Sequence, residues 1–173
     1  MTDSISDTSP DTSLRCQECG RAVAPADARM VDGQPLCLRC LFGDVPPLAV
    51  WPIGVVRNAL AREGPGVQIG RQAHSEIHLV PGMRRFLSGL SEEKALTVVW
   101  YAHAARALET TFARGLDGKI VGPFAARTPA RPNAIAITEV TVIELRDLVL
   151  VVHGLDAIDG TPVLDLKWSR GTG

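Results

Sequence analysis

Four cysteines form two pairs with the spacing of a metal site. Two residues separate Cys16 from Cys19, and after seventeen more residues Cys37 and Cys40 repeat that spacing. A two-residue gap lets both thiolates of a pair reach one ion, and the second pair completes a tetrahedron. Because four thiolates leave no coordination position open, the sequence predicts a structural Zn²⁺ rather than a catalytic one.

The alternative for these cysteines is two disulfide or redox-active pairs. The polar, acidic residues 1–13 have neither the basic nor the apolar region of a signal peptide. This favours a reducing, cytoplasmic setting, in which paired cysteines bind metal more often than they form disulfides. Residues 14–42 also resemble the treble-clef zinc knuckles of DksA-type and LIM-type proteins.

Two further stretches concentrate groups that could bind a charged ligand. Arg127 and Arg131 lie in an irregular, proline-rich segment, where guanidinium groups could bind carboxylates or phosphates in a bidentate manner. Asp156, Asp159 and Asp165 surround a tight turn, where carboxylates could accept ribose hydroxyls or an amine. The simpler explanation is that aspartates cap turns through their own backbone and that arginines are common on surfaces.

The chain from Pro52 to Lys167 resembles the TsaA/TrmO-like family of S-adenosylmethionine-dependent tRNA methyltransferases. The motifs that carry the resemblance are PIGVVR from Pro52, GPFAARTPARPN from Gly122 and LDAIDGTPVLDLK from Leu155, in the family's order. The resemblance implies a small single-sheet β-barrel that binds S-adenosylmethionine, acts as a homodimer and methylates threonylcarbamoyladenosine next to the anticodon of tRNA. The positions that it assigns to the cofactor site are Phe124, Ala125, Arg127, Arg131, Asn133, Ile135, Leu155, Asp156, Asp159, Gly160, Thr161 and Lys167, with His103 at a matching histidine.

This chain departs from the family pattern at several positions. Ala134 and Ala136 replace the proline and glycine of an Asn-Pro-Ile-Gly motif, Pro123 replaces a valine, and Trp168 stands where Pro-Tyr is usual. The cofactor motifs therefore match better than the segments expected to contact RNA. Two alternatives follow: a methyltransferase of a small molecule or another RNA, and a non-catalytic zinc-knuckle adaptor that binds S-adenosylmethionine. Clustering of Arg114, Lys119, Arg127 and Arg131 beside the cofactor would favour a tRNA enzyme.

The elements that must position these groups are mostly short strands. Apolar and β-branched runs predict strands at 48–57, 67–69, 76–80, 95–101, 134–145, 148–152 and 162–168. Short helices are expected at 83–90 and, from its Ala, Leu, Glu and Arg content, at 104–114. The fold class is therefore mainly β with some helix (α+β), without the regular βαβ alternation of a Rossmann fold.

Composition sets the domain organisation. The 173 residues are 46% hydrophobic and 21% charged, which suits a folded protein with one ordinary domain. We expect a disordered tail at 1–13, the zinc knuckle at 14–42, a linker at 43–47 stiffened by paired prolines, and the barrel domain at 48–170. A net charge of −1 provides no global attraction to nucleic acid, and no apolar run is long enough to span a membrane.

Overall fold

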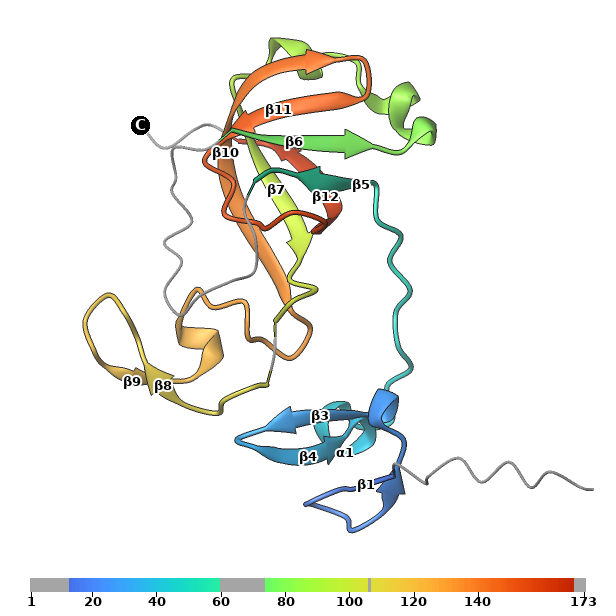
Figure 1. The fold of residues 1–173 in the computed structure, drawn as a ribbon, viewed down its shortest axis with the longest axis vertical. Coiled ribbons are helices and arrows are strands. Elements are labelled where there is room, and N and C mark those ends of the chain that lie inside the picture. The colour runs from blue at the N-terminus through green and yellow to red at the C-terminus, as the bar shows by residue number, and fades with distance from the viewer. Residues whose placement is uncertain (1–12, 60–73, 106, 170–173) are drawn as a thin grey trace, which may run out of the picture.

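The centre of the molecule is a closed six-stranded β-barrel (Figure 1). The computed structural model describes residues 13–59, 74–105 and 107–169. Every pair of adjacent barrel strands is antiparallel, in the order β10-β11-β6-β5-β12-β7. This confirms the predicted mainly-β barrel. The strands are β5 (Gly54–Arg57), β6 (His74–Leu79), β7 (Ala95–Tyr101), β10 (Ile135–Arg146), β11 (Val149–His153) and β12 (Pro162–Trp168).

Side chains along β7 alternate between the barrel core and the outer surface. Leu96, Val98 and Trp100 are buried, whereas the residues between them are only partly so. The twelve-residue β10 pairs first with β7 and then with β11, and a register shift between Val142 and Glu144 accompanies that second pairing. Completely buried Val56, Ile77, Leu150, Val152 and Val163 bring the other four strands into the same core.

Gly54 allows β5 to lie close against β6. A Cβ atom at this position would stand 2.7 Å from the backbone oxygen of His78 and 3.2 Å from the Cα of Leu79. We expect Gly54→Ala to lower the free energy of unfolding by about 3 kcal/mol, because backbone cannot move aside as a side chain can. Gly82→Ala is the matched control, since its Cβ would meet nothing within 4 Å. Urea unfolding midpoints measure both, and equal midpoints would show that the strand contact is less tight than described.

The cysteine segment forms a separate small module of two hairpins and a helix. Its elements are β1 (Leu14–Arg15), β2 (Ala22–Val23), the 3-10 turn η1 (Pro25–Asp27), β3 (Ala28–Val31), β4 (Gln34–Cys37) and α1 (Leu38–Phe42). No helix or strand occurs between Phe42 and Gly54. The predicted strand at 48–57 is therefore wrong for its first six residues, which remain an extended connection.

The largest error of the sequence-based prediction lies in the segment after β7. Residues 104–114, predicted as a helix, instead contain an isolated bridge at Leu108 and the strand β8 (Phe112–Ala113), which pairs with β9 (Ile120–Val121). Helix propensity is a weak preference, and contact with the cysteine module overrides it.

The remaining short elements lie at or near their predicted positions. The helix expected at 83–90 is the 3-10 helix η2 (Pro81–Phe86), followed by η3 (Leu90–Glu92). The strand predicted at 67–69 lies outside the described residues. Among the described residues, no helix has the length and apolar character needed to cross a membrane.

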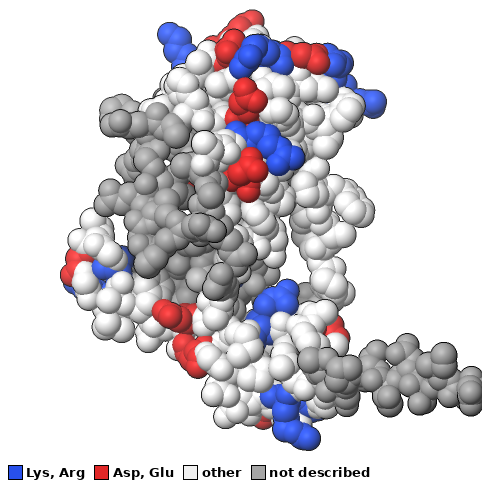
Figure 2. All heavy atoms as spheres, in the orientation of Figure 1, with Lys and Arg blue, Asp and Glu red and all other residues white. Residues whose placement is uncertain are grey.

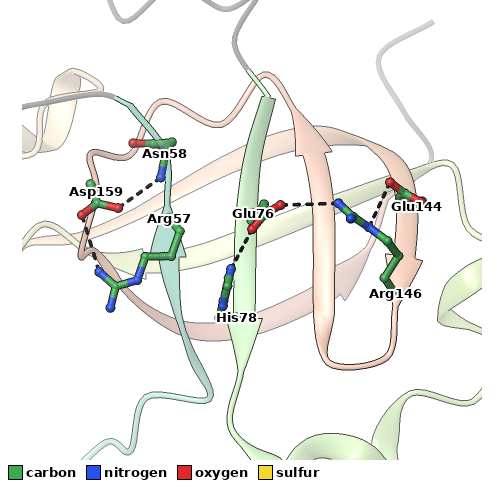
Figure 3. Close-up of polar contacts among 7 residues, drawn as sticks. All are labelled: Arg57, Asn58, Glu76, His78, Glu144, Arg146 and Asp159. Atoms are coloured by element: carbon green, nitrogen blue, oxygen red, sulfur yellow. Dashed lines mark hydrogen bonds and ion pairs between the residues drawn. The ribbon is translucent and has the colours of Figure 1, made fainter.

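One outer face of the barrel carries a row of ion pairs (Figure 3). Glu76 on β6 contacts His78 at 2.8 Å and Arg146 on β10 at 3.4 Å, and Arg146 also contacts Glu144 at 3.1 Å. Exposed pairs of this kind contribute little to stability. Their effect is to make this face hydrophilic.

Candidate functional site

The four cysteines converge on one point. The Sγ atoms of Cys16, Cys19, Cys37 and Cys40 all lie within 4.8 Å of one another, and those of Cys19 and Cys37 are 3.9 Å apart. A tetrahedron with Zn–S bonds of about 2.3 Å has sulfur–sulfur edges of about 3.8 Å. The sulfurs are therefore spaced for a shared ion, at nearly twice the length of a disulfide bond.

Backbone amides support thiolates at this cluster. The N–H of Cys37 donates to the sulfur of Cys16 at 3.3 Å, and the N–H of Cys40 donates to that of Cys37 at 3.4 Å. Backbone hydrogen bonds, chiefly from Cys19 and then Cys37, lower the pKa of the Cys16 thiol to about 6. Hydrogen bonds with the neighbouring sulfurs, that with Cys37 first, together with desolvation and the charge of Cys16, raise the pKa of the Cys40 thiol to about 12. A divalent cation would offset that charge.

Two arginines brace the loop that holds the central motif. The loop contains the 3-10 turn η4 (Pro123–Ala125). The guanidinium of Arg131 donates to the carbonyls of Pro123 at 2.8 Å and Ala126 at 3.0 Å. Arg114 donates to the carbonyl of Ala125 at 3.1 Å from the other side. These hydrogen bonds therefore hold the loop in shape.

Arg127 differs from its neighbours. Its side chain is exposed and makes no polar contact with the described residues. Phe124, three residues earlier in the same loop, is 82% exposed, with the Arg131 guanidinium 5.6 Å from its ring centroid. The loop thus offers an exposed aromatic ring and a guanidinium without a partner among the described residues, groups that can bind a flat ring and an acidic group respectively.

A second polar chain runs from the barrel interior to the surface. The Nε1–H of buried Trp100 donates to the hydroxyl of Thr138 at 3.0 Å, and that hydroxyl donates to the carboxylate of Asp156. Because an indole N–H can only donate, the Thr138 hydroxyl proton is directed to Asp156. One oxygen of Asp156 is thus fixed in place, while the residue remains exposed.

The turn that contains Asp159 is tied to the end of β5. Asp159 accepts a hydrogen bond from the backbone N–H of Asn58 at 3.1 Å and pairs with Arg57 at 3.5 Å (Figure 3). The amide of Asn58 also donates to the carbonyl of Ala157 and to the hydroxyl of Ser75, both at 2.9 Å. Sequence reasoning did not assign Asn58, Ser75, Trp100 or Thr138 to the site. Only the position of Asn58 next to the PIGVVR motif could have pointed to it.

The other assigned positions divide between core and surface. Leu155 and Thr161 are buried, and the Thr161 hydroxyl has no hydrogen-bond partner among the described residues. Gly160 has a φ of 77°, which explains the glycine in this turn. Lys167 pairs with Asp165 at 2.5 Å, and His103 is exposed just beyond β7.

A cavity of about 1140 Å³ separates the cysteine module and its connection from one end of the barrel. Three assigned positions, Arg131, Asn133 and Ile135, lie in its wall, while the Asp156 and Asp159 turns do not. Opposite them the wall includes Met30, Leu38 and Phe42 of the module. The structure thus brings part of the assigned site together here and places the rest on the loops around the barrel and, for Lys167, on β12.

One departure from the family pattern has a conformational counterpart. Ala134 has a φ of 50°, which the ring of a proline cannot reach. The alanine that replaces the expected proline therefore accompanies a different backbone conformation beside Asn133.

Comparison with known proteins gives one consistent family. Residues 62–168 match the model of the tRNA-methyltransferase O N-terminal domain. A probable S-adenosyl-L-methionine-binding protein of Methanothermobacter thermautotrophicus is 35% identical over 123 residues, which cover 69% of this chain and 88% of that protein. A mouse tRNA (adenine(37)-N6)-methyltransferase is 44% identical over 52 residues, which cover 30% of this chain and 12% of that enzyme.

The fold has solved relatives. The crystal structure of TrmO from P. aeruginosa matches with a TM-score of 0.58 and 28% identity, over 73% of this chain and 56% of that one. The chain thus spans just over half of that structure. The family match covers every strand of the barrel except β5 and leaves residues 14–42 outside. The chain therefore belongs to the family defined by the tRNA-methyltransferase O N-terminal domain.

Proposed function

We propose that this protein is an S-adenosylmethionine-dependent methyltransferase that acts on threonylcarbamoyladenosine next to the anticodon of tRNA. The observation that carries the proposal is the continuous family match over residues 62–168, which includes the GPFAARTPARPN and LDAIDGTPVLDLK motifs. The names of relatives point the same way, to S-adenosylmethionine binding and to methylation of tRNA adenine. Its four reduced cysteines suit a cytoplasmic setting.

The residues present fit such a cofactor. S-adenosylmethionine supplies an electrophilic methyl group on its sulfonium sulfur, together with a carboxylate, an amine and a ribose. The guanidinium of Arg127, which has no partner among the described residues, could bind the carboxylate, and Asp156 offers its own carboxylate to the amine or ribose. Positioning the reactants in line is the main task of the protein in a direct transfer.

The acceptor is tested by incubating the protein with labelled S-adenosylmethionine and total tRNA. The tRNA should come from a strain that lacks the native methylation, and tRNA from the parent strain, already methylated, is the control. We expect label only in the first. If the cofactor binds by calorimetry but neither tRNA is labelled, the acceptor is wrong. If the cofactor does not bind, the proposed enzyme class is wrong.

The basic residues near the motif loop form ion pairs and hydrogen bonds within the chain, which favours an acceptor other than this tRNA. That acceptor would be a small molecule or another RNA. Arg114 and Lys119 both pair with Asp117, at 2.5 and 3.8 Å, and Arg131 is engaged with loop carbonyls. On the face in Figure 2, the blue and red side chains of the described residues are interspersed, and those residues form no continuous basic area there. Label in RNA fragments or in small-molecule extracts, with none in tRNA, would identify this alternative.

We further propose that the cysteine cluster holds one structural Zn²⁺ per chain. The sulfur spacing and the N–H···S bonds support four-thiolate binding. Residues 14–42 are too few to fold on a hydrophobic core alone, so a metal would supply most of their stability. Metal analysis of the reduced protein tests this. Well under one zinc per chain, with four titratable thiols, would refute it.

Homodimerisation is proposed on the resemblance and on one apolar face. Ile135 on β10 pairs with Tyr101 on β7, and Ile137 pairs with Val99. Ile135, Ile137 and Tyr101 are 44%, 64% and 40% exposed, unlike the hydrophilic face with Glu76 and its partners, and Ile135 and Tyr101 also line the cavity beside the cysteine module. We expect light scattering to give twice the chain mass, and Ile137→Glu to return the protein to a monomer. A wild-type monomer at high concentration, with the cofactor present, would contradict this.

A further inference from the structure

The cysteine module and the long segment after β7 share backbone hydrogen bonds. The N–H of Leu108 donates to the carbonyl of Met30, and the N–H of Asp32 donates to the carbonyl of Leu108, both at 2.8 Å. Val31 and Leu108 form a parallel bridge, and Leu108 is only 8% exposed. In Figure 1 the segment passes near the end of β3 and continues into β8. Leu108 thus adds an edge to the β3–β4 hairpin.

A carboxylate strengthens this contact. Asp32, in the turn between β3 and β4, accepts hydrogen bonds from the backbone N–H of Thr110 at 2.8 Å and from its hydroxyl at 2.5 Å. Thr110, through its hydroxyl first, holds the pKa of the Asp32 carboxyl below its usual value. The carboxylate is therefore charged near neutral pH, and both hydrogen bonds are charge-assisted.

The same contacts connect the metal site to the motif loop. At its other end, the β3–β4 hairpin pairs Ala28 with the cysteine Cys37. Beyond Thr110, β8 pairs with β9, and Arg114 directly after β8 donates to the carbonyl of Ala125 in η4. The path between the cysteines and the loop of Arg127 thus consists of hydrogen-bonded contacts joined by short stretches of chain.

We propose that the cysteine module positions the cofactor loop of the barrel, with Asp32 as the positioning residue that holds Thr110. This rests on the proposed zinc and cofactor sites. In this proposal, metal binding folds the hairpin and the hairpin orders residues 108–110. These residues in turn order η4 and Arg114, which contacts it. The docked hairpin also fixes the module side of the cavity opposite Arg131 and Asn133. The module is therefore a part of the binding site that the family's domain alone does not supply.

The first test is hydrogen exchange of the full chain with and without a zinc chelator. In the zinc-loaded protein we expect slow exchange at the amides of Leu108 and Thr110. Chelation should speed exchange at both by about tenfold or more, because their acceptors lie in the hairpin. Amides of β7 should not change. If zinc leaves and the hairpin opens while exchange at Leu108 and Thr110 stays within twofold, the coupling is refuted and the metal assignment stands.

The second test separates Asp32 from the fold of the module. With one zinc per chain retained, Asp32→Ala should weaken S-adenosylmethionine binding by about threefold or more, and chelation should then have little further effect. Asp32→Asn should recover part of the loss, because its amide oxygen still accepts the Thr110 N–H and asparagine tolerates a φ of 47°. Thr110→Val removes the hydroxyl that donates to Asp32. Its affinity for S-adenosylmethionine should resemble that of Asp32→Asn.

Asp27→Ala is the matched control, since it removes the same charge from η1, away from Thr110. It should bind the cofactor as wild type does. If Asp32→Ala and Thr110→Val equal this control in both affinity and exchange, the positioning role is refuted. If the wild-type protein binds no S-adenosylmethionine, the proposed enzyme fails, and the exchange experiment still decides whether the module orders residues 108–110.

Discussion

Cys37→Ser is expected to reduce zinc from one ion per chain to less than about a tenth. Cys37 is the most connected of the four ligands: its sulfur accepts from the N–H of Cys40, and its own N–H donates to Cys16. A serine hydroxyl is not ionised at neutral pH and cannot replace a thiolate. Structural zinc supplies about 10–16 kcal/mol of apparent binding free energy in small modules, so the module should unfold without it. Metal analysis and hydrogen exchange over residues 14–42 measure both effects.

The barrel should survive this change. Its core of Val56, Ile77, Val98, Leu150 and Val163 receives no side chain from the module. Gln34→Ala, an exposed change in the same hairpin, is the control and should keep its zinc. A Cys37→Ser protein that still holds one zinc per chain would show that another ligand set binds the metal. Loss of protection in β7 as well would show that the barrel does not fold independently.

Patterns with a strict period were predictable from the sequence. The strands at 95–101 and 162–168 have the predicted bounds. Their apolar residues either alternate or follow one another directly, and both patterns are typical of strands in a closed barrel. The cysteine cluster was predictable because two-residue spacing restricts where a pair of thiolates can reach. In each case short-range chemistry determines the geometry.

Features that depend on contacts between distant segments were not predictable. Residues 104–114 have helical composition, yet Leu108 forms a β-bridge with Val31, in a hairpin about eighty residues earlier in the chain. Similarly, the sequence does not show that Arg131, one of two arginines proposed to bind an anion, also donates to carbonyls of its own loop. The number of arginines in the motif could be read from the sequence, but their division between loop support and ligand binding could not.

That division makes Arg127 the most informative single residue of the site. Arg127→Ala should weaken S-adenosylmethionine binding, or turnover, by about tenfold, because losing a charge-assisted contact of about 1.4 kcal/mol changes affinity by one decade. Arg127→Lys should recover only part, since an ammonium lacks the planar, two-pronged geometry of a guanidinium. The fold should not change, because Arg127 is exposed and contributes nothing to the core.

Calorimetric titration with S-adenosylmethionine, together with turnover on the best acceptor, distinguishes the outcomes for Arg127. Arg85→Ala is a suitable control, because it removes an exposed arginine from η2, at the other end of the barrel from η4 (Figure 1). If Arg127→Ala stays within twofold of this control in affinity and turnover, the arginine is ordinary surface and the assigned site loses its central residue. If affinity holds and turnover falls, Arg127 faces the acceptor. The cofactor carboxylate must then be held elsewhere, and Lys167 is the next candidate, because its ammonium has donors left beyond the contact with Asp165.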